Sequence, residues 1–213
     1  VIFRQNYLLW SMVFLFSIIL FPRNLKPVAV AFFAIVVLVK AVKGKSNFHW
    51  RYFLINAGFY VFIVLSLWYS DDLKSASLKL QTMSSLLIFP LLFSLLQKKD
   101  YEKIYAKKTF FFYIYILTVL IFCTVVFLWY AIVHFGFYDT TKHFSILVEK
   151  KLHKFSIHPI YLSINLGLSI IFCCYLFIKR KSIHLILLGL LLFFFLSILS
   201  KKDPKLYLIL ISF

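Results

Sequence analysis

The chain has 213 residues, of which 63% are hydrophobic and 21% aromatic, and its formal net charge is +17. Its mean hydropathy of +0.94 lies outside the range of soluble globular domains. Because the basic residues are spread over nearly every connection between apolar runs, a membrane explains the charge better than nucleic acid does. We therefore predict a polytopic membrane protein whose partner is the lipid bilayer, and we predict no nucleic-acid partner.

The apolar runs predict an all-α bundle of transmembrane helices, with about seven complete spans and an incomplete eighth, in a single domain over residues 1–213. The seven runs are Tyr7–Phe21, Val28–Val42, Tyr52–Tyr69, Leu86–Leu96, Phe110–Phe137, Pro159–Ile178 and Ile183–Leu199. The eighth begins at Leu206 and reaches Phe213, about eight residues where roughly 20 are needed. We expect the chain to be the N-terminal part of a larger, C-terminally truncated membrane domain.

The first half of the chain predicts a hairpin and an interfacial helix. The first two runs are joined by Pro22–Pro27, and each is short for a span. After the third run, Ser70 followed by Asp71 and Asp72 favours helix initiation. Apolar residues from Leu73 to Leu87 recur at spacings of three and four, which predicts an amphipathic helix lying in the interface. A helix lining an aqueous cavity is the alternative.

The second half contains the longest polar segment, Tyr138–Lys154, which we expect to be a loop. It leads into the sixth run, where Pro159 suits the first position of a helix because its missing N–H would have no partner there. His158 would then lie at the helix start, with Tyr161 one turn further on. This junction puts an imidazole and a phenol at the membrane surface.

The positions of the three cysteines favour a role in helix packing. Cys123, Cys173 and Cys174 all lie inside apolar runs, without CxxC spacing, so we interpret them as small apolar side chains. No pair of histidines has metal-ligand spacing within one helix, so we expect no metal site. We also expect no cofactor.

Lys and Arg, counted over alternate connections, favour a cytoplasmic N-terminus by a small margin. This orientation puts Lys179–Lys181 in the cytoplasm and places His158 and Lys201–Lys202 together on the outer face. Bases kept on the outer face are explained by an anionic ligand such as a lipid diphosphate. A coding bias that scatters Lys over all connections is the alternative.

Two stretches, Ser156–Ser163 and Leu199–Pro204, resemble the O-antigen ligase family of polytopic bacterial glycosyltransferases, in the form common in Bacteroidetes. In that family a His-x-x-Tyr start of a span is followed by a Ser-Ser-(Lys/Arg) turn before the next one. His158 and Tyr161 match the first motif and Lys202 the second. The early hairpin, Trp68-Tyr69-Ser70 and Ser85–Pro90 are similar as well, whereas Lys201 departs from the pattern by replacing the second Ser.

The resemblance implies transfer of a polysaccharide from an undecaprenyl diphosphate carrier to lipid A core or a similar acceptor. The reaction would occur on the periplasmic side of the bacterial inner membrane, without a metal or cofactor. The resemblance implies His158 and Lys202 as catalytic residues and Tyr161 and Lys201 as substrate-binding residues. Further catalytic residues of the family would lie beyond Phe213, so we expect the chain to be incomplete as an enzyme.

The implied roles fit the chemistry of the residues. A phosphoanhydride leaving group needs positive charge where negative charge develops, and Lys202 at a helix edge can supply it. His158 can act as a base or as a hydrogen-bond donor to phosphate. Each residue also has a structural alternative: a snorkelling interfacial lysine for Lys202, a helix cap for His158 and an aromatic-belt anchor for Tyr161.

Three other interpretations of the chain stay open at this point. A polymerase of O-antigen or exopolysaccharide would share the architecture and the carrier. A transporter or flippase would be expected to carry ionisable residues deep inside spans. Here Asn56, His134 and Asn165 are the main polar residues inside the runs, which favours an enzyme at the interface. A truncated product without function is the third possibility.

Overall fold

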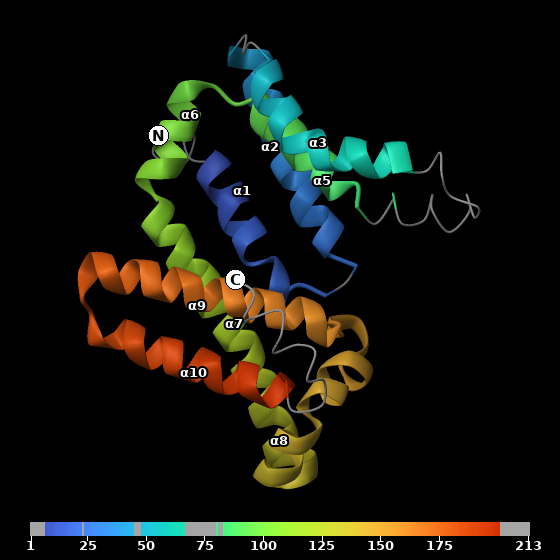
Figure 1. Ribbon diagram of the computed structural model, residues 1–213, viewed down its shortest axis with the longest axis vertical. Coiled ribbons are helices and arrows are strands. Elements are labelled where there is room, and N and C mark those ends of the chain that lie inside the picture. Colours follow the sequence, from blue (N-terminus) through green and yellow to red (C-terminus); the bar gives the residue numbers. More distant parts are fainter. Residues whose placement is uncertain (1–6, 23, 45–47, 67–79, 81–82, 201–213) are drawn as a thin grey trace. The chain divides into compact units, whose positions relative to one another are not determined.

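The computed structural model describes residues 7–22, 24–44, 48–66, 80 and 83–200 (Figure 1). The regular structure of these residues is helical, which confirms the all-α class. The chain divides into two compact units. Unit 1 comprises Val1–Leu8 and Ala31–Ala106, and unit 2 comprises Leu9–Val30 and Lys107–Phe213. The expectation of a single domain stays a prediction.

Unit 1 is built on aromatic packing between helices. Its helices are α2 (Lys26–Gly44, from Ala31 onward), α3 (Trp50–Ser66), α5 (Ser85–Ser94) and α6 (Lys98–Ala106). Phe33 of α2 is fully buried, with its ring centroid 6.5 Å from that of Phe89 and 5.5 Å from that of Phe93. Helix α5 also lies along α3 (Figure 1). Helices α2 and α3 therefore both pack against α5.

An ion pair fixes the short polar helix α6 to α2. The Lys40 ammonium donates to the carboxylate of Asp100, whose side chain is only 4% exposed while that of Lys40 is 32% exposed. Asp100 also lies in the first turn of α6, where a negative charge interacts favourably with the helix dipole. The Tyr101 hydroxyl donates to the carbonyl of Phe93. Burial, and secondarily the neighbouring Tyr52, raise the pKa of Tyr101, so its hydroxyl keeps the proton that this bond needs.

Unit 2 is organised around α7 (Lys108–Tyr130), which packs against most of its other helices. These are α1 (Tyr7–Phe16, mostly in this unit), η2 (Ile18–Leu20), η4 (Ala131–Phe135), α8 (Gly136–Ile146), η5 (Leu147–Lys151), η6 (His153–Phe155), α9 (Pro159–Arg180) and α10 (Ile183–Ser200). Figure 1 shows α9 and α10 as a hairpin beside α7. The rings of Phe112 and Phe172 stack at 4.2 Å between α7 and α9. The Tyr115 hydroxyl donates to Asn165 Oδ1 at 2.6 Å across the same contact.

The expected number of spans is wrong: among the described residues, three helices are long and apolar enough to cross a membrane, not seven. They are Lys26–Gly44, Lys108–Val133 and Pro159–Arg180. The first apolar run breaks into α1 and the 3₁₀ turn η2, and the fourth forms only the ten residues of α5. Ten residues rise about 15 Å, half of a hydrocarbon core of about 30 Å. Apolar composition alone therefore overcounts spans.

The segment expected as a loop, Tyr138–Lys154, is mostly helical. Phe144, Leu147 and Val148 recur at helical spacing and are buried in the core of unit 2, which holds the charged residues between them in helical turns. Gly136, at φ +70°, joins the π-helical turn η4 to α8 in a conformation that favours glycine. The amphipathic helix expected at 71–87 lies largely outside the described residues, and so does the incomplete eighth span.

The hairpin of α9 and α10 closes at a basic turn. Lys181 follows α9 at φ +49°, and its N–H donates to the carbonyl of Phe177 at 2.7 Å, as in a left-handed helix cap. This conformation costs a non-glycine residue about 1 kcal/mol. Lys179, Arg180 and Lys181 are all exposed, and the Arg180 guanidinium lies 5.6 Å from the centre of the Tyr113 ring of α7.

The ion pair of unit 1 predicts unequal effects of its two deletions. Lys40→Ala leaves a buried carboxylate without this partner, and we expect it to lower the free energy of unfolding by about 2–3 kcal/mol. Asp100→Ala leaves an ammonium that water can reach, and we expect a loss of about 1 kcal/mol. Denaturant unfolding of the purified protein in micelles, followed by circular dichroism, measures both. Equal losses would show that the exposure of the remaining group does not matter.

Candidate functional site

The junction between η6 and α9 positions His158. The N–H of Ile157 donates to the carbonyl of Val148 at 3.2 Å, and the Ile157 side chain is buried, so the residue before His158 is anchored in the core. His158 itself is extended, at φ −63° and ψ 135°, and is the N-cap of α9. Pro159 occupies the first helical position, as the sequence predicts. The helix start that carries His158 is therefore fixed, while its side chain is half exposed.

The two nitrogens of His158 have different partners. Nδ1 accepts the backbone N–H of Ile160 at 3.4 Å, a long capping bond. Nε2 lies 3.7 Å from Oε1 of Glu149, within ion-pair distance. Because Nδ1 accepts, we assign the proton of the neutral ring to Nε2. The accessible nitrogen of His158 is thus a hydrogen-bond donor, and the nitrogen able to act as a base is used by the cap.

Tyr161 lies one turn after His158 and is exposed, with the two ring centroids 6.1 Å apart in an edge-to-face arrangement. Lys150, Lys151 and Lys154, in the turns that precede the helix, are exposed as well. This edge of unit 2 therefore presents an imidazole N–H, a phenol and several ammonium groups to the surroundings. Such donors suit an anion with several oxygens.

The other two predicted site residues, Lys201 and Lys202, lie outside the described residues. The structure thus brings His158 and Tyr161 together, and the relation of both to Lys201 and Lys202 stays a prediction. In the parts of the chain that the structure describes, no three His, Cys, Asp or Glu side chains gather in a way that could hold a metal ion.

Polar residues inside α9 satisfy one another or the helix. Asn165 accepts from Tyr115 and donates to the carbonyl of Tyr161 at 2.6 Å. Ser163 and Ser169 are buried and donate to carbonyls one turn back, at 2.9 and 2.8 Å. Asn165 thus joins α9 to α7, whereas the two serines are satisfied within their own helix.

Sequence reasoning missed Glu149 as a neighbour of His158. Glu149 lies within the π-helical turn η5, and the 3₁₀ turn η6 follows before His158, so neither a period of 3.6 nor one of 2 relates the two residues. It also missed the Lys40–Asp100 pair, whose partners are 60 positions apart. No local signal marks either contact.

Two substitutions of His158 separate its capping from its imidazole chemistry. Asn is among the best N-cap residues and Ala among the poor ones, so we expect His158→Ala to cost about 0.5–1 kcal/mol and His158→Asn to be close to neutral. Unfolding of each purified variant in micelles measures the difference. A His158→Asn protein as unstable as His158→Ala would contradict the capping role.

Comparison with known proteins gives no match: no family model, no curated protein and no solved structure matches this chain. The helices of span length are typical of a membrane protein, and this is the part of the localisation that the structure supports. The resemblance to the O-antigen ligase family therefore rests on the sequence motifs alone.

Proposed function

We propose that this chain belongs to a membrane glycosyltransferase that moves a polysaccharide from undecaprenyl diphosphate to lipid A core or a similar acceptor, as in the O-antigen ligase family. The observation that carries the proposal is the exposed His158 edge, where an imidazole N–H and Tyr161 sit at the start of a helix of span length. A reaction at this edge meets both the lipid carrier and the sugar part of a membrane-anchored acceptor.

The charges of unit 2 support a bacterial inner-membrane orientation with this edge outside the cytoplasm. Near one end of the α7–α9 pair the structure places Lys108 beside Tyr175 of α9 and Arg180 beside Tyr113 of α7. Lys107, Lys179 and Lys181 adjoin these residues in sequence, and α7 and α9 contain no acidic residue. Lys142, Lys150, Lys151 and Lys154 lie between α7 and α9 near the His158 end, so the positive-inside rule favours the Arg180 end as the cytoplasmic one by a small margin. His158, at the other end of α9, then faces the periplasm, where the lipid-linked polymer is used.

The donor character of His158 gives it a specific role. Cleavage of the bond between the glycan and the diphosphate leaves negative charge on phosphate oxygens, which Nε2–H can stabilise by a charge-assisted hydrogen bond. Glu149 is 40% exposed and contacts the ring only at 3.7 Å, so a phosphate can replace it at little cost. In the proposed reaction Lys202 supplies the positive charge, and Tyr161 and Lys201 bind substrate. No nucleotide sugar is needed, because the diphosphate leaving group activates the sugar.

A polymerase acting on the same carrier would use the same edge and differ in its acceptor. We favour the ligase because the motifs at His158 and Lys202 are those that resemble the ligase family. The identity of the product separates the two: a ligase joins the polymer to lipid A core, and a polymerase lengthens it on the carrier.

Replacing His158 in the complete protein tests the role of the imidazole. We expect both His158→Ala and His158→Asn to lower glycan attachment by about 100-fold, since loss of a positioned proton donor typically costs this much or more. Attachment is measured as glycan-bearing lipid on gels, with immunoblots of membranes as the control for insertion. Normal attachment by His158→Asn would reduce His158 to a helix cap.

Replacing Lys202 tests the cationic part of the site. We expect Lys202→Ala to abolish glycan attachment while leaving membrane insertion intact, because the leaving diphosphate loses its counter-charge. Lys205→Ala removes the same charge from the same connection and serves as the matched control, with attachment unchanged. If Lys202→Ala attaches glycan at the normal rate, Lys202 does not belong to the site.

A further inference from the structure

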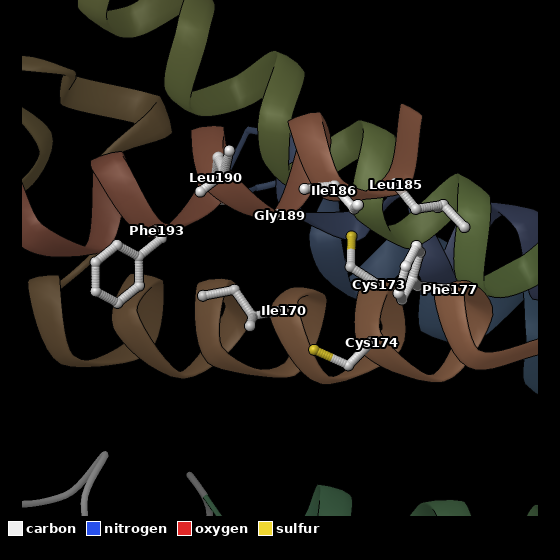
Figure 2. Close-up of a pocket in the computed structure, with 9 residues that line it drawn as sticks. All are labelled: Ile170, Cys173, Cys174, Phe177, Leu185, Ile186, Gly189, Leu190 and Phe193. Carbon is white, nitrogen blue, oxygen red and sulfur yellow. The ribbon is translucent and has the colours of Figure 1, made fainter. Parts of the chain in front are cut away.

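An apolar groove runs between α9 and α10 in unit 2, with a volume of about 310 Å³ (Figure 2). Among the described residues, no charged side chain lines it. The lining residues are Ile170, Cys173, Cys174, Phe177, Leu185, Ile186, Gly189, Leu190 and Phe193. In Figure 2 the two helices lie side by side, and Cys173 points from α9 toward α10. This lining selects hydrocarbon over any polar ligand.

The groove lies at the depth of the lipid chains and is reached from the side. Its α9 residues, Ile170–Phe177, belong to a candidate span and cover about 10 Å of that helix. Leu190 and Phe193 on its rim are 62% and 60% exposed, so this face of the hairpin is covered by no other described helix. Within a bilayer, an acyl chain can therefore enter the groove laterally.

One end of the groove meets the basic turn. Phe177 is followed within one helical turn by Lys179, Arg180 and Lys181, all exposed, and α10 re-enters the groove at Leu185. None of α7, α9 and α10 contains an acidic residue that could neutralise these cations. An apolar slot that ends at a cluster of positive charge is complementary to a molecule with an acyl chain and an anionic headgroup.

We propose that the groove binds one acyl chain of an anionic phospholipid whose phosphate is held by the turn Lys179–Lys181. A zwitterionic lipid would fill the slot equally well but would gain less from the three cations. The glycan carrier belongs, in the function proposed above, to the opposite end of α9, so we assign the groove to a membrane phospholipid. The lipid site does not rest on the proposed glycosyltransferase activity.

Native mass spectrometry of the purified protein in detergent tests the site. Phosphatidylglycerol and phosphatidylcholine with identical acyl chains are titrated in separate samples, and we expect the first phosphatidylglycerol to bind about tenfold more tightly. The double variant Lys179→Gln/Lys181→Gly should lower this preference to about threefold or less. It keeps Arg180 against Tyr113, and Gly suits the left-handed conformation of residue 181. Equal affinity for the two lipids in the unmodified protein would overturn the proposal.

The groove itself is tested by filling it. A Cβ at Gly189 would lie 4.0 Å from Cβ of Cys173, an ordinary contact, so Gly189→Ala keeps the groove and should bind phosphatidylglycerol normally. Gly189→Leu, and independently Cys174→Trp from the exposed rim, should block the slot and remove tight binding. Circular dichroism confirms that each variant is folded. If both filled variants bind phosphatidylglycerol like the unmodified protein, or if undecaprenyl phosphate displaces it at equal concentration, the assignment is wrong.

Discussion

A segment that crosses a membrane as a helix does so because lipid offers no partner to an unpaired backbone group, and it must be apolar over about 20 residues because polar side chains are costly in hydrocarbon. In unit 2, α7 and α9 meet this requirement, and much of that unit is built on their contact. Stacked rings of Phe112 and Phe172 and the bond from Tyr115 to Asn165 fix this contact. Other polar side chains of α9, such as Ser163 and Ser169, donate to carbonyls of their own helix, so the candidate site lies at the helix end.

The two ends of α9 differ in the chemistry that they offer. At its N-terminus His158, Tyr161 and Glu149 combine donors with an acceptor, as a site for a reacting anion requires. At its C-terminus the residues Lys179–Lys181 carry positive charge alone, as an anionic membrane surface requires. The fold thus separates a candidate reaction edge from a candidate lipid anchor by the length of one span, about 33 Å for 22 residues.

Much of the local structure could be predicted from the sequence, and the tertiary contacts could not. Pro159 and the apolar run after it predict the start and extent of α9 closely, because proline and hydropathy act locally.

The predicted number of spans was wrong because a run such as Tyr7–Phe21 is apolar along its length but is broken by the 3₁₀ turn η2. The charged segment before His158 looked like a loop because its few buried side chains, such as Phe144 and Val148, are outnumbered by solvated ones. His158 could be singled out, whereas its proton-donor assignment needed the positions of Ile160 and Glu149.

In the function that we propose, the His158 edge and the basic turn lie on opposite faces of a membrane, with the former outside the cytoplasm. Single cysteines at Lys154 and Lys181, in a protein whose native cysteines are replaced by Ala, can be treated in intact spheroplasts with a membrane-impermeant maleimide. We expect labelling of Lys154→Cys at once and of Lys181→Cys only after the membrane is permeabilised. Labelling of Lys154→Cys only after permeabilisation would contradict it, because a lipid-linked polymer on the outer face would then have no access to His158.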